Sequence, residues 1–172
     1  MKFSDVLCAG AILLVVNLHW NAAIAAEAIV GRASVIDGDT IEIRGEHIRL
    51  HGVDAPESWQ SCNDGDGVTY RCGKEAAMTL DQFLAVSRPT RCEFVERDRY
   101  GRFVGICFRA DGREINRWLV ESGNAVDWAR YSDGRYAAVQ ATARSKGVGL
   151  WRGKFQLPCE ARAEHAGREP TC

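Results

Sequence analysis

The chain has 172 residues, a formal net charge of −1 and seven cysteines. This length allows one domain with one substantial hydrophobic core. The nearly balanced charge excludes the class of nucleic-acid-binding proteins that are basic over their whole surface. Any binding of a polyanion therefore needs a local cluster of arginines.

The first 25 residues have the features of a secretory signal peptide. Lys2 forms the basic region, residues 7–18 are mostly apolar, and residues 23–25 give a small-residue cleavage pattern. The apolar stretch is shorter than the roughly 20 residues that a membrane-spanning helix needs. We therefore expect an exported protein, periplasmic or extracellular, with no stable membrane association after cleavage.

Six cysteines remain once Cys8 leaves with the signal peptide. An even number of cysteines in an exported chain indicates disulfides, and six cysteines allow 15 pairings. A zinc site is disfavoured because the short cysteine pairs that such sites use are absent. The sequence leaves the pairing of Cys159 and Cys172 open.

Three strands are predicted at the start of the exported chain. Residues 28–35 form the first strand, and apolar and polar residues alternate through residues 40–44. In the third strand Ile48 and Leu50 share one face, and Arg49 points to the opposite face. Asp-Gly and Gly-Glu turns separate these strands, so the pattern predicts a meander.

A long polar loop follows the third strand. It covers residues 57–73, and a disulfide between Cys62 and Cys72 would close it. Loops of this length inside compact domains are often functional. Residues 74–85 then predict a helix, because apolar residues recur there at helical spacing.

Residues 91–109 predict a β-hairpin about a turn that has Asp98 first and Gly101 fourth. Folding the two strands about this turn brings Cys92 close to Cys107, within the distance that a disulfide tolerates. A bulge at Gly101 would shift the register by one residue, so the turn decides whether the two cysteines pair.

Two further helices and a tail complete the chain. A short helix ends at Gly123, and a last helix runs from a cap at Ser132 to about residue 145. Residues 156–172 are expected to form a polar, loose C-terminal tail, which leaves residues 26–155 as the domain. Five strands with about three helices indicate an α+β protein with a small closed β-barrel. The OB-fold, whose face binds oligonucleotides, is a five-stranded barrel of this kind.

Charged residues gather where the predicted strands meet turns. Asp39 and Asp54 supply carboxylate oxygens for a hard cation, with a backbone carbonyl and waters completing its shell. Arg49 and Arg102 supply planar, bidentate donors for a phosphate. Glu57 is able to orient or deprotonate a water molecule. A cation, an arginine pair and a base are the groups that phosphodiester cleavage needs.

Five passages together resemble the staphylococcal nuclease family over roughly residues 28–151. They are VIDGDTIEI, IRLHGVDAPE, DRYGRFVG, EINRWLVESGNA and GVGLW, in the family's order and at its spacing. Several motifs in register are far more specific than any one alone. The resemblance implies an OB-fold nuclease that uses one Ca²⁺ and acts as a monomer.

The resemblance also implies roles for individual residues. Those of the catalytic centre are the Ca²⁺ ligands Asp39, Asp54 and Thr40 (through its backbone carbonyl), the phosphate-binding Arg49 and Arg102, and the general-base or water-orienting Glu57. Tyr100 and Tyr131 match positions that contact the nucleotide, and Arg99, the basic residue of the same turn as Tyr100, is expected to bind the substrate with them. Two substitutions depart from the family's founding member: Arg99 stands in place of a lysine in the turn, and Ala129 in place of a second tyrosine.

The resemblance implies hydrolysis of single-stranded DNA and RNA, and more slowly of double-stranded DNA, at the P–O5′ bond. An alternative is an OB-fold module that binds nucleic acid or protein with little or no catalysis. A second alternative is a structural domain held together by disulfides. Both arginines, both aspartates and the glutamate are present, and this favours the nuclease.

Overall fold

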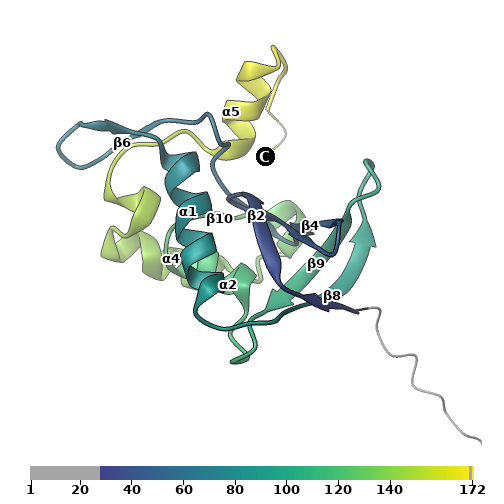
Figure 1. Ribbon diagram of the computed structural model, residues 1–172. Helices are drawn as coiled ribbons and strands as arrows, with labels where there is room; N and C mark the ends of the chain where they lie inside the picture. Colours follow the sequence, from purple (N-terminus) through teal and green to yellow (C-terminus); the bar gives the residue numbers. More distant parts are fainter. Residues whose placement is uncertain (1–27, 171) are drawn as a thin grey trace, which may run out of the picture.

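The computed structural model describes residues 28–170 and Cys172, so the predicted signal peptide lies outside the described residues. Its main sheet has six strands in the order β1-β8-β9-β4-β3-β2 (Figure 1). The strands are β1 (Ala28–Gly31), β2 (Ala33–Asp37), β3 (Thr40–Ile43), β4 (Glu46–Leu50), β8 (Thr90–Arg97) and β9 (Phe103–Phe108).

The sheet closes into a barrel because its two edge strands are consecutive in the chain. Only Arg32 separates β1 from β2, yet β1 pairs with β8 and β2 pairs with β3. The predicted first strand is thus divided at Arg32 and serves both edges. The predicted OB-fold barrel with α additions is confirmed, with six strands where five were expected.

The β8–β9 hairpin has the predicted pairing. Cys92 lies directly opposite Cys107, and the two form a disulfide. Next to the turn Arg97 pairs with Phe103, whereas a turn from Asp98 to Gly101 alone would pair it with Arg102, so the register is shifted by one residue at Gly101. A second irregularity, between Phe94 and Glu96, shifts the register back, and Cys92 therefore lies opposite Cys107.

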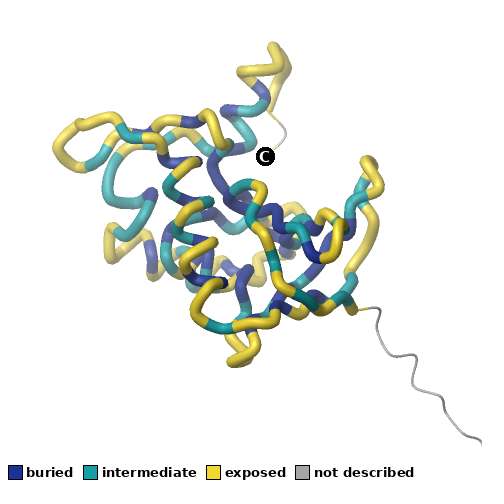
Figure 2. The backbone as a smooth tube through the Cα atoms, viewed as in Figure 1, coloured by how far each residue is buried: buried dark blue, intermediate teal, exposed yellow. Residues whose placement is uncertain are grey.

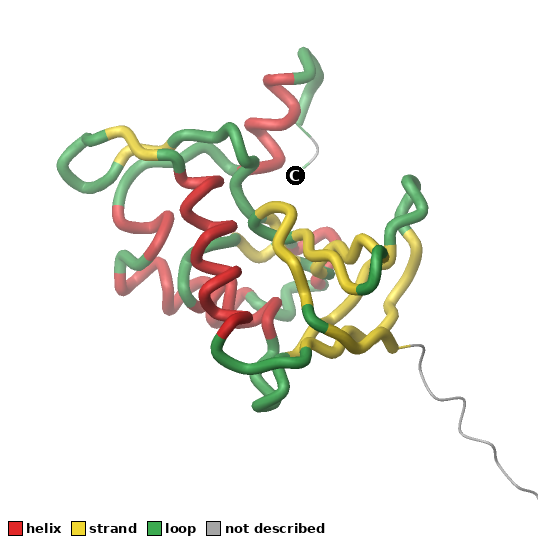
Figure 3. The backbone as a smooth tube through the Cα atoms, in the orientation of Figure 1, coloured by secondary structure: helices red, strands yellow, loops and turns green. Residues whose placement is uncertain are grey.

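Helices cover one side of the barrel and complete the core (Figures 2 and 3). The α-helices are α1 (Cys72–Ala85), α2 (Ile115–Glu121), α3 (Ala129–Ser132), α4 (Ala137–Lys146) and α5 (Pro158–His165), with a 3-10 helix η1 at Gly149–Arg152. Ile48 and Leu50 are almost completely buried and Arg49 is only partly so, as the alternation in β4 predicted. No helix within residues 28–170 is long and apolar enough to cross a membrane.

Two small sheets shape the loops. The strands β5 (Val53–Asp54) and β10 (Val126–Asp127) pair with each other, as do β6 (Cys62–Asn63) and β7 (Thr69–Tyr70). The predicted Cys62–Cys72 disulfide is present, so the long loop is a hairpin fastened to the start of α1. The predicted cap at Ser132 is wrong: α4 begins at Ala137, and the Ser132 hydroxyl donates to Asp127 Oδ1 at 2.5 Å.

The expectation of a loose tail is also wrong. Residues 158–165 form α5, with Pro158 at the first position of the helix, where its missing N–H leaves no donor unpaired. The Glu160 carboxylate accepts a hydrogen bond from the Leu157 amide at 3.2 Å and so caps this end. A disulfide joins Cys159 to Cys172 and holds the end of the chain against the helix.

Candidate active site

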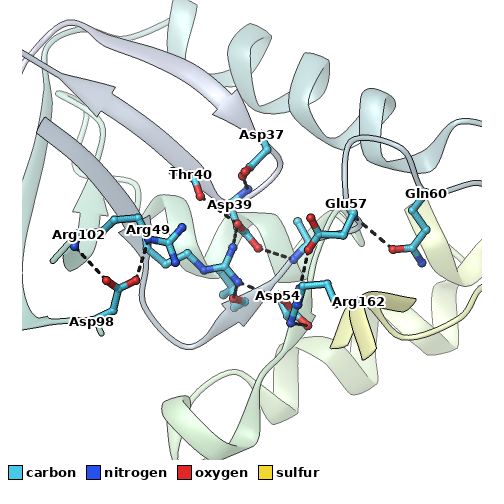
Figure 4. A network of polar contacts seen from close by, with 12 residues as sticks. Asp37, Asp39, Thr40, Arg49, Asp54, Glu57, Gln60, Asp98, Arg102 and Arg162 are labelled. Atoms are coloured by element: carbon cyan, nitrogen blue, oxygen red, sulfur yellow. Dashed lines mark hydrogen bonds and ion pairs between the residues drawn. The ribbon is translucent and has the colours of Figure 1, made fainter. Parts of the chain in front are cut away.

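The predicted catalytic residues come together at one end of the barrel (Figure 4). Pairing of β3 with β4 sets Thr40 opposite Arg49, so Asp39, in the turn before β3, comes next to that arginine. The Asp39 carboxylate also accepts a hydrogen bond from the Ala55 amide at 2.8 Å. This bond holds the turn before β3 against the chain just after Asp54.

Arg49 lies between two buried carboxylates. One terminal nitrogen contacts Asp39 Oδ1, and the other lies 3.1 Å from Asp54 Oδ1. The carboxylates of Asp39 and Asp54 belong to residues only 2% and 1% exposed, and buried charges of this kind need a counter-charge. Burial lowers the pKa of Arg49, and the charges of Asp54 and Asp37 oppose this only in part, so the pKa lies below its usual value. A guanidinium nevertheless stays charged at any physiological pH.

A third arginine, Arg162, reaches from α5 to one of these carboxylates, Asp54, and to Glu57. Its Nη1 donates to Asp54 Oδ1 at 2.7 Å and to Glu57 Oε1 at 2.8 Å, and its Nη2 donates to Asp54 Oδ2 at 3.0 Å. Burial opposes its charge most, but the hydrogen bonds and charges of the two carboxylates together raise the pKa of Arg162. Sequence reasoning missed this residue, because it belongs to no motif and lies in the segment expected to be loose.

Glu57 is held in the loop after β5 by contacts of its main chain. Its main-chain N–H donates to the side-chain oxygen of Gln60 at 3.3 Å, and its main-chain carbonyl accepts from the main-chain N–H of Gln60 at 2.8 Å. Gly73 packs against that same carbonyl so closely that a Cβ there would lie 1.7 Å from the oxygen. The start of α1 therefore positions the loop that carries Glu57.

Arg102 belongs to the turn of the β8–β9 hairpin. Its Nε donates to Asp98 Oδ2 at 2.7 Å, while Asp98 Oδ1 accepts from the amides of Tyr100 and Arg102, each at 2.9 Å. Burial raises the pKa of Asp98, but these bonds outweigh it and hold the pKa below its usual value. Asp98 thus orients Arg102 and shapes the turn that presents Tyr100 and Arg99.

An open groove of about 810 Å³ runs past these residues, between the hairpin turn and α5. Its lining includes Arg49, Glu57 and Arg102 and the three predicted substrate-binding residues, Arg99, Tyr100 and Tyr131. Seven arginines and five acidic residues line it, so the expected local cluster of arginines is present on this nearly neutral protein.

Trp128 also lines the groove and was not predicted to contribute to the site. Its ring is 5.8 Å from the Arg49 guanidinium and 5.2 Å from that of Arg162, and Tyr131 meets it edge-on. An aromatic face at such distances attracts cations. Trp128 therefore supports two arginines of the site and the tyrosine beside them.

The donors present suit a hard cation. Asp39 and Asp54 both reach one guanidinium, so their oxygens converge, and the Thr40 hydroxyl is 3.3 Å from Asp39 Oδ1. Oxygen ligands are those that Ca²⁺ prefers, and backbone oxygens or waters commonly complete its shell. Among the described residues no cluster of three or more Asp, Glu, His or Cys side chains forms a metal cage, so such a shell depends on other oxygens.

The family model "Staphylococcal nuclease homologue" matches residues 47–153, more than half of the chain. This range contains Arg49, Asp54, Glu57 and Arg102, whereas Asp39, Thr40 and Arg162 lie outside it.

Relatives in bacteria and fungi are similar to this chain. "Succinoglycan biosynthesis protein ExoI" of Rhizobium meliloti (strain 1021) is 58% identical over 163 residues, 95% of this chain and 85% of the relative. An "Uncharacterized endonuclease" of Escherichia coli O157:H7 is 30% identical over 129 residues, 72% of this chain and 77% of the relative. "Probable endonuclease LCL3" of Pyricularia oryzae is 25% identical and covers 69% of this chain, but only 49% of the fungal protein is matched.

Proposed function

Because this chain belongs to the family of staphylococcal nuclease homologues, we propose that it is an exported, Ca²⁺-dependent nuclease. It hydrolyses phosphodiester bonds in DNA and RNA with little sequence preference. One observation carries this proposal: Arg49, Arg102 and Glu57 line one arginine-rich groove, and Arg49 contacts the buried carboxylates of Asp39 and Asp54.

The chain's own residues have distinct tasks in the reaction. Asp39 and Asp54, with a backbone oxygen of Thr40, hold the Ca²⁺, which when bound supplies positive charge to the reacting phosphate. Arg49 and Arg102 donate hydrogen bonds to the phosphate oxygens, and these bonds strengthen as negative charge builds in the transition state. Glu57 orients the attacking water or accepts its proton. Attack on phosphorus breaks the P–O5′ bond and leaves a 3′-phosphate.

The groove suits a single strand. Tyr100 and Tyr131 are exposed beside arginines, and bases stack on such aromatic faces without sequence preference. A duplex buries its base faces, which supports slower cleavage of double-stranded DNA. A single chain provides every proposed site residue, which supports a monomer.

Export rests on the signal-like first 25 residues and on the disulfides. The structure contains the two predicted pairs and a third, Cys159–Cys172. Disulfides persist in the periplasm and outside the cell and are rare in the cytosol. The exported domain begins near residue 26.

Cleavage of a fluorescent single-stranded DNA by the mature protein tests the proposal. We expect products with excess Ca²⁺ and none with a chelator. Replacement of a general base commonly costs about 10²–10⁴-fold in rate, so Glu57→Gln should lower turnover by that factor while the melting temperature changes little. Glu121→Gln, an exposed change on α2, is the matched control. Cleavage in chelator, or wild-type turnover by Glu57→Gln, would contradict the mechanism.

A module that binds nucleic acid without cleaving it is the second candidate. One observation favours it: Arg162 forms ion pairs with both Asp54 and Glu57, which neutralises a proposed metal ligand and the proposed base. Saturable oligonucleotide binding without products, in the presence of Ca²⁺, would select this candidate.

A further inference from the structure

The C-terminal helix α5 enters the active site although it lies beyond the part of the chain that the family model matches. That match ends at residue 153, and α5 spans Pro158–His165. Figure 4 shows Arg162 lying beside Asp54 and Glu57. The residue is therefore part of the site's geometry, and the nuclease motifs do not account for it.

Arg162 occupies both oxygens of the Asp54 carboxylate. It donates to Oδ1 at 2.7 Å and to Oδ2 at 3.0 Å, while Arg49 contacts Oδ1 from the other side at 3.1 Å. A bidentate arginine–carboxylate pair is among the stronger hydrogen-bonded contacts in proteins. A cation that binds Asp54 through either oxygen must compete with this pair.

Two contacts fix the segment of α5 where Arg162 makes this pair. The His165 ring stacks on Trp59, with ring centroids 4.6 Å apart, and the Gln60 amide group donates to the Gln156 carbonyl at 2.7 Å. Trp59 and Gln60 belong to the loop that carries Glu57, so the helix is fastened to the same segment as the proposed base.

We propose that Arg162 determines the cation affinity of the active site, as an internal counter-ion that a divalent cation must displace from Asp54. The inference rests on the proposed role of Asp54 as a Ca²⁺ ligand. The Arg162 guanidinium pairs with Glu57 as well as with Asp54. Displacement of Arg162 therefore frees the proposed metal ligand Asp54 and the proposed base Glu57 together. The C-terminal segment, through Arg162, thereby weakens Ca²⁺ binding. Activity then requires that Ca²⁺ bind and displace Arg162.

Calorimetric titration of the mature protein with Ca²⁺ alone tests this. Hydrogen bonds to charged groups contribute about 1.5–3 kcal/mol, so Arg162→Gln should bind Ca²⁺ about tenfold more tightly than the wild type, or more. Arg162→Lys keeps the charge but lacks the planar fork, so its affinity should lie between the two. The matched control is Arg168→Gln, which removes a charge from the same segment at an exposed position and should change affinity by less than about twofold.

A second measurement does not depend on binding heat. A ligand that binds only the folded state raises the melting temperature, and at one ligand concentration the rise is larger for tighter binding, growing with the logarithm of the affinity. Ca²⁺ should therefore raise the melting temperature of Arg162→Gln more than that of the wild type.

The outcomes separate this inference from the proposed function. Equal Ca²⁺ affinity in the wild type and Arg162→Gln would overturn the inference, and the nuclease proposal would stand if cleavage still required Ca²⁺. An equal gain in Arg168→Gln would also overturn it, because the effect would then be the field of any nearby positive charge. If neither protein bound Ca²⁺, the inference and the Ca²⁺ requirement of the nuclease would both fail.

Discussion

Replacement of Gly73, in the first turn of α1, by alanine adds one methyl group and directly tests how Glu57 is positioned. A Cβ built on Gly73 would lie 1.7 Å from the Glu57 carbonyl oxygen and 3.0 Å from the Ser58 amide nitrogen. Ordinary van der Waals contact begins at about 3.4 Å, so in Gly73→Ala the helix and the loop must separate by roughly 1.7 Å. The atoms in contact are main-chain atoms, which cannot turn aside as a flexible side chain does.

This displacement should affect both activity and stability. A catalytic group misplaced by about 1 Å can cost about 10²-fold in turnover, and overpacking costs about 1–3 kcal/mol of stability. We expect Gly73→Ala to show both losses, measured as turnover on single-stranded DNA at saturating Ca²⁺ and as the free energy of unfolding in urea.

Gly112→Ala separates the two effects. Gly112 has φ +83° and no atom within 4 Å of its built Cβ, so alanine there brings backbone strain of about 1–2 kcal/mol without a collision. Its stability should fall while its turnover stays at the wild-type value. Wild-type turnover and stability in Gly73→Ala would refute the packing argument. A loss of turnover no larger than that of Gly112→Ala would refute the link between α1 and Glu57.

Two further predictions concern the hairpin. Removal of the Cys92–Cys107 disulfide by paired alanine substitutions should lower the free energy of unfolding in urea by about 2–4 kcal/mol, and free thiols at these positions in the native protein would contradict the assignment. The folded pKa of Asp98 lies below its unfolded value of about 4, so its interactions with Arg102 stabilise the fold above that pH and are lost as pH falls through the folded pKa. The melting temperature of Asp98→Asn should therefore lie below that of the wild type near neutral pH, and the gap should narrow in acid; a gap independent of pH would argue against this pair.

The barrel could be predicted because its signals are local. Alternation in residues 40–44 and around Arg49 reports which side of each strand is buried, since successive side chains in a strand point to opposite faces. The turn that begins at Asp98 likewise indicates the hairpin, but the pairing of Cys92 with Cys107 also depends on the irregularity between Phe94 and Glu96. The closure of the barrel was harder to predict. The first strand is divided at Arg32 because its two halves pair with different strands, and the local sequence does not indicate those partners.

The nuclease-like residues were predicted by motif, and the tertiary structure explains why they are compatible with one another. Asp39 and Asp54 are two buried negative charges in adjacent positions, an arrangement that is costly without compensation. Arg49 compensates them because β3 and β4 pair in the register that sets Thr40 opposite it. The motif thus records a charge balance that only strand pairing produces.

The sequence by itself determined the family, the barrel and the residues of the nuclease-like motifs, because these depend on neighbours within a few positions or on passages in a fixed order. Only the tertiary structure decided that the C-terminal segment belongs to the site. Pro158 and Glu160 mark the start of a helix locally, but nothing local shows where that helix docks. Arg162 meets Asp54 across 108 positions of sequence. A contact of that range depends on the packing of the whole chain, and a linear pattern carries no record of it.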